Sequence, residues 1–272
     1  MSIPSITLND GNTIPQFGLG VFLMKPEITQ EYVAFALANG YRHIDTAAIY
    51  GNEREVGLAI AESGIPRDEL FITTKLWNSR QSDAPAALAE SLEKLGLDHV
   101  DLYLIHWPTP KFDTYIEAWQ ALEGLRAEGL TRSIGVSNFN ENHLRRVIAE
   151  GTVVPAVNQI ELHPTLAQPE LKAVNDELGI ATEAWGPLGK GDLDEDVVVR
   201  IAEKLGKSPA QVILRWHIQH GNIVFPKSQN NDRLLANAQI FDFELSDDDI
   251  LAIDELDRDN RHGPDPEVFD RR

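Results

Sequence analysis

The sequence predicts one α/β domain in which eight parallel strands and their helices close into a (β/α)8 barrel. Three observations support this fold: eight short apolar segments, a helical stretch after nearly every one, and short connections between them. Strands that are apolar along their whole length are typical of a parallel sheet covered on both faces. The chain of 272 residues also has room for eight such units, which need about 250 residues.

The eight candidate strands can be placed along the chain. They span residues 17–20, 42–45, 70–75, 100–105, 133–137, 156–159, 180–184 and 223–225. An open, doubly wound sheet is the alternative fold, and it would need a G-x-G-x-x-G fingerprint after its first strand. Gly18-Leu19-Gly20 is followed by Val21, Phe22 and Leu23, so the fingerprint is incomplete and the closed barrel is favoured.

Turn and cap residues mark the other elements. Residues 5–8 and 13–15, joined by Asn9-Asp10-Gly11-Asn12, predict a β-hairpin outside the barrel. Asp83 can cap a helix that Gly96 ends, and Ser208 followed by Pro209 begins another helix. The polar stretch from residue 257 onward predicts a loop draped over the domain. We find no linker, so residues 1–272 are predicted to form a single domain.

The composition excludes several classes of partner. With 43 acidic and 24 basic residues, the net charge of −19 repels nucleic acid and anionic membranes. The absence of cysteine excludes disulfides and thiolate zinc sites. No signal-peptide pattern and no apolar run of about 18 residues is present. We therefore expect a soluble cytoplasmic protein whose partner is a small molecule.

Ionisable residues gather at the ends of three successive strands. Asp45 ends the second strand, Tyr50 lies in the loop after it, Lys75 ends the third strand and His106 follows the fourth. Because the active sites of such barrels lie at the C-terminal ends of the strands, we expect these four side chains at one rim. A lone residue of this kind is often only a salt bridge or a satisfied polar group. For four together, a catalytic site explains the residues as well as structural polar groups do.

These four side chains suit the reduction of a carbonyl group. Tyrosine is a weak acid with a pKa of about 10, and an ammonium such as that of Lys75 favours the phenolate and lowers this pKa. Asp45 can hold Lys75 in place, and His106 can donate a hydrogen bond to the carbonyl oxygen. General acid catalysis of this kind accelerates a reaction by roughly 10²–10⁴-fold.

Polar residues after later strands could bind a nicotinamide cofactor. Ser137, Asn138 and Gln159 carry groups that can grip a carboxamide, although ordinary turn chemistry also explains them. Trp185 could stack on the nicotinamide ring or could be a buried aromatic residue. Loops after the last strands of these barrels often bind phosphate. Lys227, Ser228, Arg233 and Asn237 follow the eighth strand and could bind a cofactor phosphate or form a solvated surface cluster.

A metal site is not predicted. Glu161 and His163 lie two residues apart on one strand, but the motif offers no third ligand. Neither H-E-x-x-H nor G-x-x-x-x-G-K-[ST] occurs in the chain. His43 and His163 are therefore expected to be core or supporting residues.

Three segments resemble the signatures of the aldo-keto reductases. The first is GYRHIDTAAIYGNE at residues 40–53, the second is IGVSNF at residues 134–139, and the third is Pro226-Lys227-Ser228 with Arg233. They occur in the family's order over essentially the whole chain. The short length and the WGPLG sequence that begins at Trp185 resemble the bacterial branch that includes 2,5-diketo-D-gluconate reductases.

This resemblance implies an NADPH-dependent reductase of aldehydes and ketones, including small dicarbonyls such as 2,5-diketo-D-gluconate. It implies a catalytic tetrad of Asp45, Tyr50, Lys75 and His106, with Tyr50 as the general acid. It also implies cofactor contacts from Ser137, Asn138, Gln159, Trp185, Gly186, Leu188, Lys227, Ser228, Arg233 and Asn237, and a substrate pocket walled by Phe22, Trp77, His106 and Trp107.

The chain departs from the family pattern near its phosphate site. Ala236 stands where relatives usually have a glutamate that contacts the adenine, and Gln229 and Asn230 replace residues that include a basic one in the bacterial branch. NADH therefore stays open as a cofactor. A non-catalytic nicotinamide-binding protein and a metal-dependent hydrolase are the competing functions. We expect a monomer, and the sequence does not identify the substrate.

Overall fold

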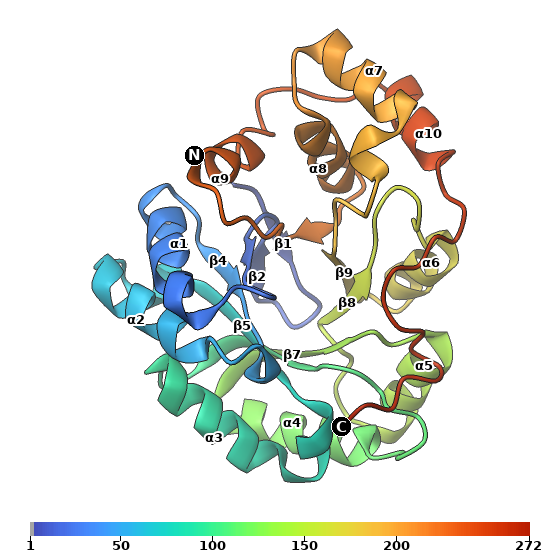
Figure 1. Cartoon of the computed structure of the whole chain (residues 1–272). Helices are drawn as coiled ribbons and strands as arrows, with labels where there is room; N and C mark the ends of the chain where they lie inside the picture. The colour runs from blue at the N-terminus through green and yellow to red at the C-terminus, as the bar shows by residue number, and fades with distance from the viewer. Residues whose placement is uncertain (1–2) are drawn as a thin grey trace.

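The computed structural model describes residues 3–272 and shows a ring of helices around a parallel barrel (Figure 1). The strands are β3 (Leu19–Gly20), β4 (His43–Asp45), β5 (Phe71–Leu76), β6 (Val100–Ile105), β7 (Thr131–Ser137), β8 (Val157–Glu161), β9 (Ala181–Trp185) and β10 (Ile223–Val224). Each strand pairs in parallel with the next along the chain. A parallel bridge between Phe17 and Val224 joins the last strand to the first, which confirms the closed barrel.

Helices connect the strands on the outside of the barrel. They are α1 (Pro26–Ala38), α2 (Glu53–Ser63), α3 (Ala84–Leu95), α4 (Tyr115–Ala127), α5 (Glu141–Glu150), α6 (Pro169–Glu177), α7 (Asp196–Leu205), α8 (Pro209–Gln219), α9 (Asn231–Asn237) and α10 (Asp247–Asp254). Short 3-10 turns occur at η1 (Ala48–Tyr50), η2 (Arg67–Glu69), η3 (Asn78–Asp83) and η4 (Asp192–Asp194). Within residues 3–272, no helix combines the length and apolar character that crossing a bilayer requires.

The predicted hairpin closes one end of the barrel. Strands β1 (Ser5–Thr7) and β2 (Thr13–Pro15) pair antiparallel, with Ile6 opposite Ile14. The hairpin buries Leu8 and Ile14 against the apolar lower interior of the barrel, formed by Phe71, Leu102, Leu104, Ala156, Val157 and Ile223. Figure 1 shows the hairpin in the middle of the view, seen through the ring of strands. The N-terminal end of the barrel is therefore sealed, and the opposite end is left for a site.

The predicted helix caps are partly correct. The Ser208 hydroxyl accepts a hydrogen bond from the backbone N–H of Gln211. Gly96 ends α3 in the left-handed conformation with φ 64°. Asp83 stands at the N-cap position of α3 as predicted, but its side chain makes no cap hydrogen bond. Its carboxylate instead pairs with the Arg80 guanidinium at 3.0 Å. A charged partner within one turn competes with the backbone for this carboxylate.

The C-terminal segment after α10 forms neither helix nor strand, as predicted for a draped loop. It runs past α6 and α5 in Figure 1 and ends near the loop before α4. Asn260 donates from its backbone amide to Thr165 O at 2.9 Å, and Asp270 accepts from the Lys111 amide at 3.0 Å. These hydrogen bonds hold the segment over the C-terminal ends of the strands.

Candidate active site

Lys75 is the centre of a polar group inside the barrel. Its Nζ atom lies 2.7 Å from Asp45 Oδ1, 2.8 Å from Asp45 Oδ2, 2.9 Å from Thr46 O and 3.5 Å from Tyr50 Oη. Burial alone disfavours the ammonium, but the negative charge of Asp45 outweighs it and raises the pKa of Lys75. The structure thus brings together three of the four predicted catalytic residues, with the phenol hydroxyl beside a fixed cation.

Tyr50 ends the 3-10 turn η1, and its pKa differs from our prediction. Burial raises the pKa of Tyr50 to about 12, although the Lys75 charge acts in the opposite direction. Lys75 acts on this pKa in the predicted direction, but burial outweighs it, so the pKa does not fall below its usual value. The cause is desolvation, which disfavours the phenolate more than one ammonium favours it. Tyr50 is consequently a neutral phenol that still holds the proton it could donate.

His106 completes the predicted four. Its ring meets the Tyr50 ring edge to face at 5.8 Å between centroids and the Trp77 ring at 5.3 Å. Burial and the Lys75 charge lower the pKa of His106 well below its usual range, so the imidazole is neutral. A neutral imidazole donates from one nitrogen and accepts at the other. It can therefore offer a hydrogen bond without adding charge.

Sequence reasoning missed Glu183 on β9, whose side chain is wholly buried inside the barrel. Its Oε2 atom accepts from Gln159 Nε2 at 2.9 Å, and its Oε1 atom lies 3.6 Å from His43 Nε2. Burial, with the charge of Asp45, raises the pKa of Glu183 to about 8. The available signal was a lone carboxylate within an otherwise uncharged, buried strand.

The four predicted nicotinamide contacts form one network beside the tetrad. The side-chain amide of Gln159 donates to Asp45 Oδ2 at 2.9 Å, and Ser137 Oγ donates to the backbone carbonyl of Gln159 at 3.0 Å. Asn138, with φ 62°, donates to both Ser137 Oγ and His106 O at 3.0 Å. Trp185 Nε1 donates to Asn138 Oδ1 at 2.8 Å. Hydroxyl and amide groups are thus fixed beside Asp45 and His106.

The predicted phosphate residues lie together after β10. Lys227 and Arg233 are exposed, whereas Ser228 and Asn237 are buried. Within residues 3–272, neither cation has a carboxylate within 4.0 Å. The Asn230 side chain caps α9 by accepting from the Arg233 amide at 2.9 Å. Two cations without carboxylate partners in so acidic a chain fit an anionic ligand.

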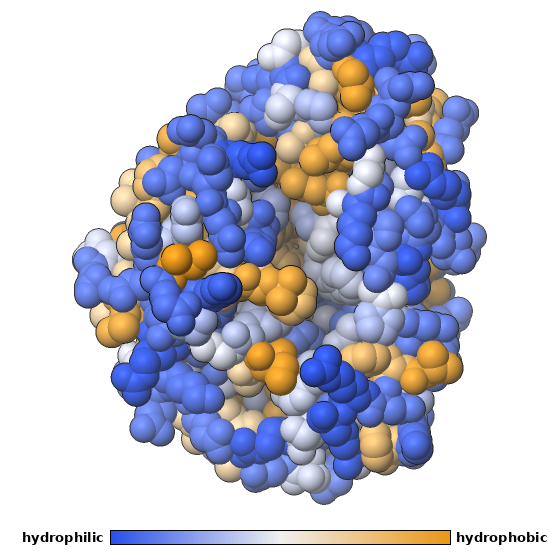
Figure 2. Space-filling model, in the orientation of Figure 1, coloured by the Kyte–Doolittle hydropathy of each residue, from blue (hydrophilic) through white to orange (hydrophobic). Residues whose placement is uncertain are grey.

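Aromatic side chains surround the opening above Tyr50. Figure 2 shows a hollow in the middle of this face with apolar residues around it. Phe22 is 55% exposed, and its ring lies 5.0 Å from that of Tyr50. Trp107 is covered by Phe269 of the C-terminal segment, with 4.4 Å between ring centroids. Phe269 is therefore a further wall residue. Sequence reasoning missed it because the polar tail gave no sign of where it would lie.

Gly186 and Leu188, the other two predicted cofactor residues, lie in the loop after β9. Gly186 is exposed and left-handed with φ 61°, and Leu188 is half-buried against the core. The loop then reaches Asp192, which begins η4. This places both residues at the same end of the barrel as Trp185.

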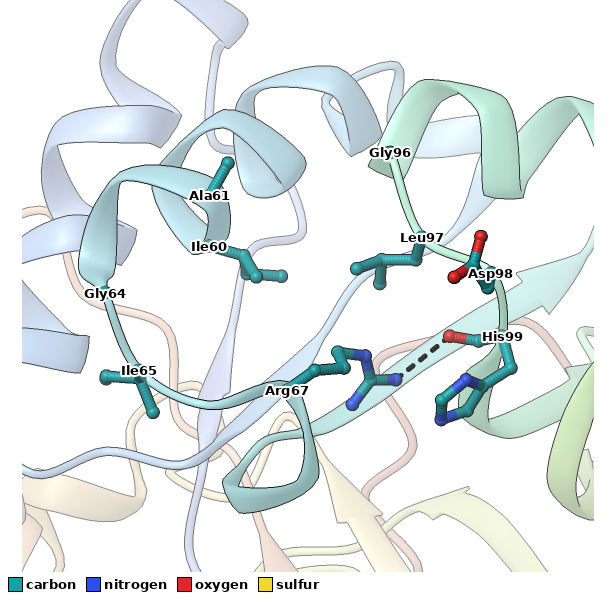
Figure 3. Close-up of a pocket in the computed structure, with 9 residues that line it drawn as sticks. All are labelled: Ile60, Ala61, Gly64, Ile65, Arg67, Gly96, Leu97, Asp98 and His99. Carbon is teal, nitrogen blue, oxygen red and sulfur yellow. Dashed lines mark hydrogen bonds between the residues drawn. The ribbon is translucent and has the colours of Figure 1, made fainter.

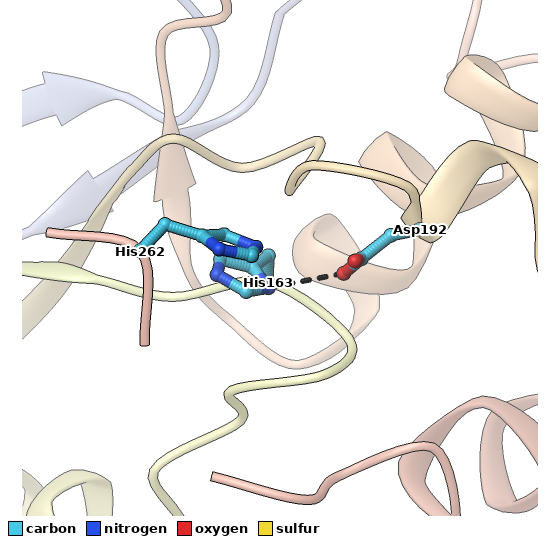
Figure 4. Close-up of side chains that lie close together, drawn as sticks. All are labelled: His163, Asp192 and His262. Atoms are coloured by element: carbon cyan, nitrogen blue, oxygen red, sulfur yellow. Dashed lines mark hydrogen bonds and ion pairs between the residues drawn. The ribbon is translucent and has the colours of Figure 1, made fainter. Parts of the chain in front are cut away.

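A histidine cluster fixes this loop and the C-terminal segment to each other. His163 Nδ1 lies 3.0 Å from Asp192 Oδ2, and its Nε2 lies 3.3 Å from Glu161 Oε1. The His262 ring stacks on His163 at 4.8 Å with 12° between planes (Figure 4). Glu161 also accepts from the backbone amides of His262 and Gly263 at 2.7 and 2.8 Å. We call Glu161, His163, Asp192, His262 and Gly263 the tail clamp.

The tail clamp brings together three residues that could bind a metal, His163, Asp192 and His262. The sequence pattern offered only Glu161 and His163, without a third ligand. Two observations argue against a metal there. Both nitrogens of His163 already face carboxylates. Moreover, the lone pairs of stacked rings lie in parallel planes and do not converge on one ion. The arrangement is that of an imidazole held between two carboxylates, which raise its pKa although burial acts in the opposite direction.

A separate pocket of about 310 Å³ lies at the opposite end of the barrel (Figure 3). It is lined by Ile60, Ala61, Gly64, Ile65, Arg67, Gly96, Leu97, Asp98 and His99. Arg67 there already pairs with Asp101 at 2.7 Å and donates to His99 O at 3.0 Å. The active sites of such barrels lie at the C-terminal face, whereas the N-terminal face serves stability. The pocket is therefore not part of the candidate site.

Comparisons with known proteins agree with this geometry. A sequence profile described as the Aldo/keto reductase family matches residues 16–258. An aldo-keto reductase of Mycolicibacterium smegmatis is 57% identical over 269 residues, which cover 98% of each chain. A methylglyoxal reductase DkgA of Yersinia pestis is 52% identical, covering 98% of this chain and 97% of the relative. A crystal structure of a Gox0644 variant in complex with NADPH is 45% identical and superposes with a TM-score of 0.95, covering 99% of each chain.

The chain belongs to the aldo/keto reductase family. This confirms the predicted family, the barrel with its N-terminal hairpin, and the class of enzyme, an oxidoreductase that uses a nicotinamide cofactor.

Proposed function

We propose that this protein reduces small aldehydes and ketones with NADPH, and that Tyr50 is the general acid. The observation that carries the proposal is the position of Lys75 Nζ, 2.7 Å from Asp45 Oδ1 and 3.5 Å from Tyr50 Oη. A phenol that faces an aromatic cleft and touches a fixed ammonium is suited to give a proton to a substrate oxygen. The family of carbonyl reductases to which the chain belongs supports this reaction class.

Each residue of the site has a separate role in the proposed proton transfer. When bound, the reduced nicotinamide supplies the hydride that the carbonyl carbon accepts. Tyr50 gives its phenolic proton to the carbonyl oxygen as negative charge develops there. Lys75 stabilises the phenolate that is left, and Asp45 keeps Lys75 charged and in place. The neutral His106 donates a hydrogen bond to the same oxygen and orients the substrate. Solvent then returns a proton to Tyr50.

The donor set fits the proposed cofactor. Ser137, Asn138 and Gln159 present hydroxyl and amide groups next to the tetrad, as a carboxamide requires. Trp185 is held by Asn138 and offers its ring as a stacking surface. Lys227, Ser228 and Arg233 would hold the 2′-phosphate, since exposed cations suit a dianion. A similar protein, the Gox0644 variant, was crystallised with NADPH, which supports NADPH over NADH.

We infer that the substrate is a small carbonyl compound, such as methylglyoxal or 2,5-diketo-D-gluconate. The walls formed by Phe22, Trp77, Trp107 and Phe269 leave a cleft lined by rings rather than by charges. The relatives named methylglyoxal reductase, at 52% and 48% identity, support a small dicarbonyl. A monomer in the cytoplasm remains our prediction, and light scattering of the purified protein would test the oligomeric state.

The test is the fall in NADPH absorbance, and separately in NADH absorbance, with purified protein and a panel of carbonyls. The panel contains methylglyoxal, 2,5-diketo-D-gluconate and benzaldehyde. We expect NADPH consumption that depends on the carbonyl, with slower consumption of NADH. Tight NADPH binding by fluorescence without turnover on any panel member would instead favour the non-catalytic nicotinamide-binding protein.

A further inference from the structure

Glu183 is a buried carboxyl group that the proposed mechanism does not use. It lies on β9 between Gln159 of β8 and Ile223 of β10 in register. Its side chain is fully buried, and its Oε1 atom has no hydrogen-bond partner among residues 3–272. A carboxyl in such a place is unfavourable unless its hydrogen bonds compensate. Packing alone would be served better by an apolar side chain of the same size.

Within residues 3–272, the one hydrogen bond of the Glu183 side chain goes to Gln159. The Gln159 amide nitrogen donates at 2.9 Å to Glu183 Oε2 and at 2.9 Å to Asp45 Oδ2. An amide nitrogen carries two hydrogens, so the two carboxyl groups use both of them. The amide oxygen of Gln159 accepts no hydrogen bond from any residue between 3 and 272. It is the polar atom of this side chain that is left for a ligand.

The terminal torsion of glutamine is broad and roughly two-fold, so a free amide readily exchanges its oxygen and nitrogen positions. In this site the exchange would place the Gln159 oxygen against two carboxyl groups. Two acceptors on one side therefore fix the amide in one orientation. Asp45 alone would provide only half of this constraint.

We propose that Glu183 is a positioning residue, which together with Asp45 locks the Gln159 amide so that its oxygen is free to accept a hydrogen bond from the nicotinamide carboxamide. The inference rests on the proposed function, in which Gln159 contacts that carboxamide. A carboxamide NH2 that met a reversed Gln159 would face another donor. Glu183 thereby selects the correct orientation without touching the cofactor.

The charges around Glu183 are consistent with this role. Asp45 and His43 face it from β4 and Lys75 from β5, whereas its strand neighbours Gln159 and Ile223 do not titrate. Burial and the Asp45 charge raise the pKa of Glu183 to about 8, and burial lowers the pKa of His43 to about 3. These shifts limit the negative charge beside the Lys75–Asp45 pair, while Glu183 Oε2 accepts from Gln159 Nε2 at 2.9 Å.

The test compares two full-length variants with the wild type. E183M keeps the length of the side chain but removes the acceptor, and E183Q keeps an acceptor oxygen. Dissociation constants are measured by fluorescence for NADPH and for adenosine 2′,5′-bisphosphate, which has no nicotinamide. We expect E183M to bind NADPH about tenfold more weakly, the change that corresponds to one lost hydrogen bond. We expect it to bind the bisphosphate as the wild type does, and E183Q to recover most of the NADPH affinity.

Equal weakening of both ligands in E183M would show that Glu183 only supports the fold, and unchanged NADPH binding would also overturn the inference. If E183M does not fold by circular dichroism, E183T replaces it with the same expected pattern, because threonine is too short to reach Gln159. A wild type that fails to bind NADPH or to consume it with any carbonyl would instead refute the proposed function.

Discussion

The Nζ atom of Lys75 lies 2.7 Å from Oδ1 of Asp45, in an interior where neither side chain is more than 2% exposed. A buried ion pair of this kind is strongly destabilised when one partner is lost, since the other charge stays buried without compensation. We therefore expect the pair to matter for stability as well as for the proposed catalysis.

This pair predicts a large effect of Lys75→Met. We expect the free energy of unfolding in urea to fall by about 3–5 kcal/mol and reductase activity to be lost. The double variant with Asp45→Asn should recover part of the stability, because it removes the orphaned carboxylate. If the double variant is less stable than Lys75→Met alone, the loss does not come from a buried charge.

Tyr50→Phe should abolish carbonyl reduction and leave NADPH binding nearly unchanged. Only the hydroxyl is removed, and Oη lies beside Lys75 at 3.5 Å rather than in the network of Ser137 and Asn138. We expect kcat to fall by at least about 10²-fold, the lower end of the effect of general acid catalysis. Tyr32→Phe on α1 is the matched control and should keep full activity. Reduction by Tyr50→Phe at the wild-type rate would remove Tyr50 from its proposed role.

The fold was predictable because it depends on local pattern. All eight predicted strands exist, each within a few residues of its predicted bounds, since a fully apolar strand between helices leaves few alternatives. The same logic placed Asp45, Lys75 and His106 at one rim, because strand ends of a barrel meet whatever their separation in sequence.

The features that could not be predicted from the sequence depend on desolvation and on contacts between residues far apart in the chain. The pKa of Tyr50 rises because of burial that no spacing reveals. Glu183 acquires its partner Gln159 only when β8 and β9 pair in register. Phe269 and Gly263 reach the site through an irregular tail, and such a segment carries no periodicity from which to predict its path.

Arg233→Ala should weaken NADPH binding much more than NADH binding. Its guanidinium is exposed and proposed to hold the 2′-phosphate, which NADH lacks. A charge-assisted hydrogen bond is worth roughly 1.5–3 kcal/mol, so we expect a loss of at least about tenfold in NADPH affinity. Titration of both cofactors by fluorescence provides the measurement, and Arg200→Ala on the exposed face of α7 is the control. Equal losses for the two cofactors would place the 2′-phosphate elsewhere.

Gly263→Ala should displace the Trp185 indole, although residue 263 belongs to the C-terminal segment and not to the barrel. A Cβ atom at residue 263 would lie 2.4 Å from Trp185 Cη2 and 2.9 Å from Glu161 Oε2, so the indole must move. We expect weaker NADPH binding, a changed tryptophan emission spectrum and a loss of about 1–3 kcal/mol of stability. Gly124→Ala is the control. It has open space in helix α4 and should gain up to about 1 kcal/mol. An unshifted emission spectrum in Gly263→Ala would mean that the tail does not hold the indole.

The tail clamp predicts a stability difference that depends on pH. Although burial favours neutral His163, the hydrogen bonds and charges of Asp192 and Glu161 outweigh it and raise the pKa of His163 above its ordinary value of 6.5. For both carboxyls burial again opposes the shift, but His163 and backbone amides lower the pKa values of Glu161 and Asp192 below their ordinary 4.5 and 3.8.

The sign of the effect follows from these shifts. A raised pKa in the folded state stabilises the fold fully below pH 6.5 and ceases to do so as the pH rises through the folded value. The lowered carboxyl pKa values stabilise the fold above pH 4.5 and cease to do so as the pH falls through the folded values. The advantage of the wild type over His163→Gln, measured by urea unfolding from pH 4 to 9, should therefore be greatest between these limits. It should decline toward alkaline pH, and a difference that grows there would show that His163 is neutral in the folded protein.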